Sequence, residues 1–248
     1  MACGGSSTER WNIFYDIASA PPVVTYAPNP WKTRYALNFK GVHYQTEWVQ
    51  LPDVPSVRQR IGVAPVRTHQ DGSSFYTLPI IKDPSTGQVV GDSFEIAVYL
   101  DKTYPNAPSL FPPSTIPLQQ AFNVHVDAAF GPFVILFVQS MPLNPDNAEI
   151  TKATFCERAG KEKWEGKERA RTFIKFEAAL GELAKLYRHT DGPFMNGGTP
   201  VYADIIFGGW LAFMNATLPA KEWEDVQKWH DGLWGKLHRA LGKYAEIK

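Results

Sequence analysis

Residues 26–37, with the sequence YAPNPWKTRYAL, place two prolines in front of a helix-forming stretch. Proline suits the first turn of a helix, where its missing N–H would have no partner in any case. The pattern therefore predicts a helix that begins at about Pro30. The free N–H groups and the positive dipole end of such a helix are a seat for an anion, so this corner is the first candidate for chemistry.

A second signal is the Leu78-Pro79 pair, which lies inside an apparent strand. Proline at such a place indicates either an edge strand or a cis peptide bond. A cis bond would turn the backbone N–H and C=O of Leu78 outward, where they can pair with an extended peptide as an added strand does.

The third signal is Gly91-Asp92-Ser93, which stands at the start of another predicted helix. A free hydroxyl and free N–H groups can bind a carboxylate, and the Asp92 carboxylate can hold an ammonium group. Both ends of an amino acid can be gripped there. The alternative interpretation, a plain helix cap, is the commoner role of Asp-Ser at such a position.

The segments that must position these groups alternate between strand and helix patterns. Period-two alternation predicts strands, and four-residue spacing of apolar side chains predicts helices, with Gly41 and Ser93 as helix boundaries. The predicted elements, in the order β-α-β-α-β-β-α, are residues 12–17, 30–40, 43–51, 56–61, 77–83, 88–92 and 93–104. Short βαβ units favour a parallel sheet, and the tight turn at residues 83–87 makes the last pair antiparallel. This order is typical of an α/β thioredoxin-like domain.

The second half of the chain has a different pattern. Five prolines between residues 105 and 117 indicate a stiff linker, and all that follows has helical periodicity. We therefore expect a flexible leader at residues 1–9, a thioredoxin-like domain at residues 10–104, a Pro-rich linker at residues 105–117 and an all-α domain at residues 118–248.

Composition excludes several classes of protein. The 248-residue chain carries 25 basic and 25 acidic residues without a block of like charge, which argues against nucleic-acid or membrane-surface binding. Cys3 and Cys156 give neither a disulfide framework nor metal-ligand spacing, so no metal is expected. The chain begins without a secretory signal pattern and has no segment long enough to span a bilayer. We expect a cytoplasmic protein.

Taken together, these motifs resemble the glutathione transferase family, from Arg10 to the C-terminus. TLPII (residues 77–81) matches the family's cis-proline loop, and GDSFEIAVYLD (residues 91–101) matches its γ-glutamyl-binding helix start. GGTPVYADIIFGGWL (residues 197–211) looks like the capping segment of the helical domain. More narrowly, Pro28 and WKTRYALNFKG (residues 31–41) look like the fungal FuA class, which is related to the bacterial β-aryl etherases of lignin breakdown.

The resemblance implies how glutathione, the cosubstrate, would be held. The backbone of Leu78, before Pro79, would pair with the cysteinyl part of glutathione, and Asp92 and Ser93 would hold its γ-glutamyl end. Trp31 and Lys32 would lie beside the glycyl part or the pocket wall, with a solvated lysine as the alternative for Lys32. The thiol would lie at the helix start, near residues 27–30.

One position departs from the family pattern. Ala27 stands where related enzymes place a catalytic serine, whose hydrogen bond lowers the pKa of the glutathione thiol. Lowering that pKa by about two units requires about 3 kcal/mol. A hydrogen bond to a charged acceptor supplies roughly 1.5–3 kcal/mol, and a helix dipole about 0.3–2 kcal/mol. Activation is therefore expected to be partial unless Thr25, Tyr26 or, as the preferred donor, Asn29 replaces the serine.

The helical domain is expected to supply the acceptor site. Aromatic side chains at helical spacing usually belong to a core, but the N-terminal part of the helix that holds residues 122–133 faces the sulfur in this architecture. The predicted acceptor-site residues are Tyr26, Pro30, Phe122, His125, Val126, Phe133, Trp210 and Met214. Asp204, near the start of a later helix, is expected to be structural.

These observations lead to two functional hypotheses. The first is a homodimeric glutathione transferase that acts on hydrophobic aromatic compounds, such as plant polyphenols or aryl ethers, by thiolate attack or by cleavage of an ether or thioester. The second is a non-catalytic, glutathione-dependent protein that binds and sequesters aromatic molecules. A thioredoxin-type disulfide reductase is excluded because no cysteine occupies the helix start.

Overall fold

Four strands form one mixed sheet in the computed structural model, which describes residues 11–68, 72–158 and 167–248. The strand order is β2-β1-β5-β6. β1 (Asn12–Ile17) runs parallel to β2 (Tyr44–Val49) and antiparallel to β5 (Ile80–Asp83), which pairs antiparallel with β6 (Gln88–Gly91). The predicted thioredoxin-like topology is confirmed, whereas the predicted leader lies outside the described residues.

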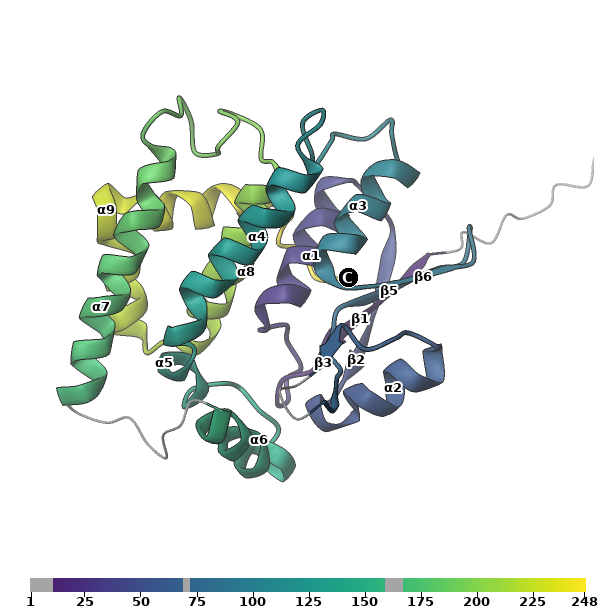
Figure 1. Ribbon diagram of the computed structural model, residues 1–248, viewed down its shortest axis with the longest axis horizontal. Coiled ribbons are helices and arrows are strands. Elements are labelled where there is room, and N and C mark those ends of the chain that lie inside the picture. The colour runs from purple at the N-terminus through teal and green to yellow at the C-terminus, as the bar shows by residue number, and fades with distance from the viewer. Residues whose placement is uncertain (1–10, 69–71, 159–166) are drawn as a thin grey trace, which may run out of the picture.

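Three helices complete the sheet half of the molecule (Figure 1). α1 (Pro28–Phe39) and α3 (Ser93–Thr103) lie together on one face of the sheet, and α2 (Val54–Ile61), which follows the 3-10 turn η1 (Leu51–Asp53), lies on the other. A small hairpin of β3 (Arg67–Thr68) and β4 (Ser74–Phe75) was not expected, because strands of two residues are too short to show a period.

Two helix boundaries differ from the prediction. α1 begins at Pro28 and not at Pro30, because Ala27 is already the N-cap in extended conformation. α3 is capped by Asp92 and not by Ser93, because the Asp92 carboxylate accepts hydrogen bonds from the backbone N–H groups that follow it. The predicted end of α1 is confirmed: Gly41 follows the C-cap with a positive φ of 66°, a conformation that glycine adopts without strain.

The rest of the described chain is helical, as predicted (Figure 1). The helical half consists of α4 (Ile116–Phe130), η2 (Gly131–Phe133), α5 (Ile135–Val138), α6 (Pro145–Arg158), α7 (Lys167–Ala184), η3 (Lys185–Tyr187), α8 (Tyr202–Thr217), α9 (Ala220–Leu241) and η4 (Gly242–Tyr244). α4 begins inside the segment predicted as linker, with Pro117 in its first turn. The break expected at Gly131-Pro132 separates α4 from α5. No described helix is long and apolar enough to cross a bilayer.

The two halves meet where α8 packs directly on α1, and two adjacent glycines allow this close approach. A Cβ atom on Gly209 would lie 2.5 Å from the Pro28 carbonyl oxygen and 2.7 Å from Lys32 Cγ. A Cβ atom on Gly208 would lie 3.2 Å from Cε2 of Tyr35, on α1, and 2.5 Å from Cδ1 of Leu241, on α9. α8 is therefore a buried helix that fixes the start of α1 from behind.

Asp204 is a structural residue at the start of α8, as expected. It is fully buried, and its Oδ2 atom accepts the N–H of Val201 at 2.9 Å. Its Oδ1 atom accepts the Tyr187 hydroxyl and the Met195 N–H, both at 2.9 Å. One carboxylate thus satisfies three donors and ties the loop before α8 to its first turn.

A buried ion pair joins the sheet to α1. Arg34 Nη2 lies 2.7 Å from Asp16 Oδ2, and both side chains are 0% exposed. Arg34 Nη1 also donates to the Tyr44 hydroxyl at 3.2 Å, and its guanidinium lies 5.0 Å from the centre of the Phe14 ring. Asp16 Oδ1 accepts the backbone N–H of Ile17.

The last residues of the chain return to the sheet and lie along the outer side of β2. The backbone N–H of Thr46 donates to the Lys248 carbonyl at 3.1 Å. The Tyr44 hydroxyl donates to the Glu246 carbonyl at 3.1 Å. Asn38 Nδ2 donates to the carbonyls of Glu246 and Tyr244, both at 2.8 Å. This tail connects the helical half to the edge of the sheet.

A histidine in α9 gives the protein a predicted pH dependence. Burial lowers the pKa of His238 below its ordinary 6.5, and Arg239 lowers it further. The unfolded chain therefore binds the proton more readily, and stability falls as the pH drops below about 6.5. We expect His238→Phe to make the loss of stability between about pH 7 and pH 5 shallower, measured by urea unfolding at each pH. His189→Phe, at an exposed position, is the control, and an unchanged slope for His238→Phe would contradict the prediction.

Candidate functional site

The start of α1 offers an anion few backbone donors. Of its first amides, Pro28 and Pro30 have no N–H, and the Trp31 N–H is already bonded to the Ala27 carbonyl at 3.1 Å. The Asn29 N–H is the one that remains. The expected row of free N–H groups is therefore reduced to one main-chain donor, the Asn29 side-chain amide and the helix dipole.

The other two proposed donors face the core. Thr25 and Tyr26 are 4% and 3% exposed. Burial raises the pKa of the Tyr26 hydroxyl, and the negative charge of Asp16 raises it further. Asn29 is half-buried at the helix start, and this placement favours it over Thr25 and Tyr26.

The proline loop has the expected form. The Leu78-Pro79 peptide bond is cis. The Leu78 side chain is buried, and the pairing of β5 with β1 begins only at Ile80, opposite Tyr15. The main chain of Leu78 therefore stands outside the sheet ladder, in a position to pair with an extended peptide.

The Gly91-Asp92-Ser93 segment lies next to this loop. The Asp92 N–H donates to the Pro79 carbonyl at 3.3 Å. Asp92 has a φ of 82°, and its Oδ1 atom accepts the backbone N–H of Phe94 at 2.8 Å. Ser93 is 3% exposed. Asp92 therefore acts as a helix cap, the commoner role weighed for this motif, and only its half-exposed carboxylate remains at the surface.

Arg58 of α2 is a residue that sequence reasoning missed. Its side chain is buried, and it donates to the carbonyls of Thr77 and Ala64. A Cβ atom on Gly91 would lie 2.9 Å from Arg58 Nη2. Burial lowers the pKa of Arg58, and the charge of Asp92 opposes this. Arg58 thus supports the proline loop from behind. Nothing in the sequence distinguishes this role from that of any other arginine in a short helix.

Lys32 requires a correction. It was expected beside glutathione or in solvent, but it is fully buried. Its Nζ atom lies 2.7 and 3.0 Å from the two carboxylate oxygens of Asp127 and 3.1 Å from Asn123 Oδ1, both on α4. Asp127 Oδ1 also accepts the Trp210 Nε1–H at 2.7 Å. The Lys32 ammonium group therefore joins the two halves of the molecule through its contacts with α4. Trp31, one position earlier, is half-buried.

The predicted acceptor-site residues fall into three groups. Val126 and Met214 are 0% exposed and belong to the core, so they cannot form a pocket wall, and Tyr26 and Pro30 are also buried. His125 is exposed on α4. The aromatic residues at intermediate or low exposure are Phe122, which contacts Phe207, Phe133, which contacts Phe176, and Trp210, which stacks on Phe130.

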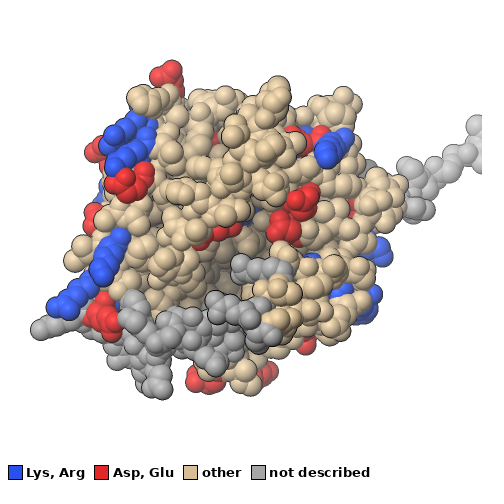
Figure 2. All heavy atoms as spheres, viewed as in Figure 1, with Lys and Arg blue, Asp and Glu red and all other residues tan. Residues whose placement is uncertain are grey.

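The surface between the two halves is hollowed. Figure 2 shows this hollow with acidic side chains at its margin and few charges on the surrounding surface. α4 lies on one side of it and the sheet half on the other. The start of α1, the main chain of Leu78, which lies outside the sheet ladder, and the carboxylate of Asp92 thus belong to elements that lie together beside this hollow.

Comparisons with known proteins identify this arrangement. Residues 26–103 match the glutathione S-transferase N-terminal domain, and residues 117–244 match the glutathione S-transferase C-terminal domain. A glutathione S-transferase of Ceriporiopsis subvermispora, whose crystal structure contains glutathione, is 38% identical with a TM-score of 0.86, and the match covers 96% of this chain and 99% of that one. The chain belongs to the glutathione S-transferase family.

Other relatives agree with the family and with the fungal resemblance. The transferase is similar to GSTFuA2 of Phanerochaete chrysosporium, with 31% identity, a TM-score of 0.85 and coverage of 96% of this chain and 99% of that one. It is also 29% identical to the glutathione S-transferase-like protein ustS of Aspergillus flavus, over 94% of this chain and 90% of that one. The predicted enzyme class and its cosubstrate, glutathione, are thereby confirmed.

Proposed function

We propose that this transferase joins glutathione to hydrophobic aromatic acceptors, with the thiolate held at the start of α1. The observation that carries the proposal is the grouping of Asn29, Leu78 and Asp92 on elements that meet beside the hollow. The Leu78 main chain pairs with the cysteinyl part of the cosubstrate, the Asp92 carboxylate holds its ammonium group, and Trp31 lies beside its glycyl end.

Asn29 supplies the donor that Ala27 lacks. Its side-chain amide and its N–H are both near the free end of α1, so each can donate to the sulfur anion and lower the thiol pKa. The thiolate then attacks an electrophilic carbon of the acceptor and forms a carbon–sulfur bond. The leaving group departs with the electron pair of the broken bond, as a halide or, in an aryl ether, as a phenolate.

The choice of an aromatic acceptor is supported by half-buried aromatic side chains of α4, which lies along one side of the hollow, and of the turn η2 that follows it. Phe122 and Phe133 are half-buried and offer aromatic surface, whereas Trp210 is only 7% exposed and stacks on Phe130. The surrounding surface carries few charges. Planar polyphenols and aryl ethers match such a surface by stacking. A homodimer in the cytoplasm completes the proposal, since transferases of this family are generally dimers and glutathione is a free thiol in a reducing compartment.

A second candidate function is glutathione-dependent binding of aromatic molecules without turnover, and Ala27 is the observation that favours it. Ala27 has no hydroxyl, and the helix dipole with one backbone donor gives only part of the roughly 3 kcal/mol that full thiolate formation requires.

Ala27→Ser tests the thiolate-activation step. A hydroxyl at this position adds a hydrogen bond to the thiolate of about 1.5–3 kcal/mol, so we expect turnover of a chromogenic aryl halide to rise by about 10- to 100-fold. Asn29→Ala is expected to lower it. Ala107→Ser, in the segment before α4, is the matched control. If neither Ala27→Ser nor the original protein turns over the aryl halide while both bind glutathione in calorimetry, the binding function replaces the enzyme. Absence of saturable glutathione binding would overturn both.

A further inference from the structure

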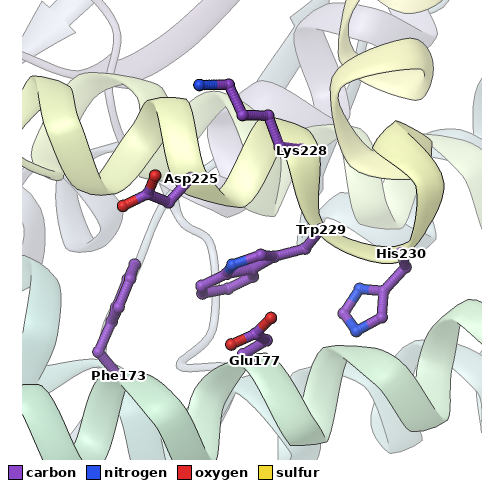
Figure 3. A pocket seen from close by; sticks show the side chains of 6 residues that line it. All are labelled: Phe173, Glu177, Asp225, Lys228, Trp229 and His230. Atoms are coloured by element: carbon purple, nitrogen blue, oxygen red, sulfur yellow. The ribbon is translucent and has the colours of Figure 1, made fainter.

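A cleft of about 460 Å³ lies between α7 and α9 in the helical half. Phe173 and Glu177 of α7 line one side, and Asp225, Lys228, Trp229 and His230 of α9 line the other (Figure 3). In Figure 1 α7 and α9 lie at the end of the molecule opposite the sheet. The cleft is therefore separate from the glutathione site, and the proposed transferase activity makes no use of it.

A break in α9 shapes this cleft. After Trp229, in extended conformation, His230, Asp231 and Gly232 have positive φ values of 53°, 60° and 74°. A left-handed conformation costs a residue other than glycine roughly 1–2 kcal/mol. The break turns the Trp229 and His230 side chains toward α7. In a continuous helix these side chains would not point at α7.

The imidazole of His230 is fixed at one end of the cleft. Its Nδ1 atom accepts the indole N–H of Trp234 at 2.9 Å. Its Nε2 atom would lie 3.0 Å from a Cβ atom on Gly181, so the ring packs against α7 at the position where that helix has no side chain. Because Nδ1 is the acceptor, the N–H of a neutral ring is at Nε2.

Aromatic rings form the floor of the cleft. The Trp229 indole lies 4.8 Å from the Phe173 ring and 6.0 Å from the Phe176 ring, measured between centroids. Trp229 and Phe173 are both half-buried, so part of each ring is open to solvent. The face of an indole attracts a cation more strongly than that of any other aromatic side chain.

Two carboxylates and one ammonium group, those of Glu177, Asp225 and Lys228, line the cleft. Glu177 is exposed, and its carboxylate points toward Trp229 and His230 in Figure 3. No lysine, arginine or histidine of residues 11–68, 72–158 and 167–248 forms a recorded ion pair with Glu177. Asp225 adds a second carboxylate, which Lys221 partly neutralises at 2.8 Å. The Lys228 side chain extends away from the rings.

We propose that this cleft binds a small organic cation, in which an ammonium group is attached to an apolar or aromatic body. The ammonium group lies against the Trp229 ring and beside the Glu177 carboxylate, and the apolar body lies toward Phe173. An anion of the same shape as this cation is repelled by both carboxylates. A neutral molecule of that shape binds more weakly than the cation because it lacks the attraction between charges. The cleft has room for a small molecule but is open to solvent on one side, so weak binding is expected.

Calorimetry with benzyltrimethylammonium tests the proposal on the full chain. We expect saturable binding in the millimolar range, weakened about three- to tenfold by Glu177→Gln, which removes the charge and keeps the shape. Glu182→Gln, the same substitution at an exposed position of α7, is the matched control and is expected to leave the affinity unchanged. Benzenesulfonate, the anion of similar size, is expected not to bind.

Three results would overturn the proposal: no saturation by the cation, equal affinity in Glu177→Gln, or equally tight binding of benzenesulfonate. Glutathione binding is measured on the same samples and is expected to be the same in all three proteins. If the cation does not bind but glutathione does, the cation proposal fails and the proposed transferase function is unaffected. If glutathione does not bind, the proposed function fails and the cation result is judged by itself.

Discussion

Replacing Asp16 by asparagine is expected to lower the free energy of unfolding by about 3–5 kcal/mol, the cost of leaving one partner of a buried ion pair without its counter-charge. Arg34 is 0% exposed, and its shortest polar contact is the one to Asp16, at 2.7 Å. Its other contacts are with uncharged groups, namely the hydroxyls of Tyr44 and Thr46 and the rings of Phe14, Tyr44 and Trp48. Urea unfolding followed by circular dichroism measures the loss.

Two further variants make the cause of that loss clear. Asp16→Leu combined with Arg34→Met removes both charges, so we expect it to recover most of the stability. Glu47→Gln also breaks a carboxylate–arginine pair on the same sheet, but Glu47 and Arg60 are 45% and 68% exposed and 3.6 Å apart. That exposed pair is expected to contribute below about 1 kcal/mol. Equal losses in Asp16→Asn and Glu47→Gln would show that burial is not the deciding factor.

The second large effect is expected from Asp127→Asn. This change leaves Lys32 buried without a counter-charge, and we expect a loss of stability of about 3 kcal/mol. Because Lys32 belongs to α1 and Asp127 to α4, the loss also loosens the start of α1 against the helical half. Glutathione affinity is therefore expected to fall about tenfold, measured by calorimetry alongside urea unfolding.

Lys32→Met separates the two roles considered for this lysine. If Lys32 only joins the two halves, the double variant Lys32→Met with Asp127→Leu recovers both stability and glutathione affinity. A double variant that is stable but binds glutathione poorly would show that the lysine contacts the cosubstrate directly. Asp191→Asn, at an exposed loop position, is the control for removing an acidic charge.

The order of elements was predictable because it depends on local chemistry. At Pro79 the local pattern left an edge strand and a cis bond open, and the family resemblance implied the cis bond. Alternating apolar residues, turn residues and proline act over a few positions of the chain. The sequence resemblance then supplied the family. Local signals also gave Gly41 as the end of α1, since a left-handed residue after a helix favours glycine.

The site was less predictable because the direction of a side chain depends on what packs against it. From the local sequence, Lys32 is expected to be solvated or to bind a ligand. It is buried because α8 packs on it at Gly209, a residue almost 180 positions away in sequence. The helical spacing of Val126 fits both a pocket residue and a core residue. Only the packing of α8 against α4 determines that it belongs to the core. Arg58 gave no signal at all, because its partners are backbone carbonyls that any sequence carries.

The chain end that lies along β2 accepts its hydrogen bonds from Asn38, Tyr44 and Thr46 through main-chain oxygens, those of Tyr244, Glu246 and Lys248, beside the packing of the Tyr244 ring on Phe39. Every peptide unit offers such an oxygen, whichever side chain it carries. The hydrogen bonds of this segment therefore depend on the number of its residues and not on their type. A changed side chain leaves the main-chain acceptors in place. An added or missing residue moves them out of reach of Asn38, Tyr44 and Thr46.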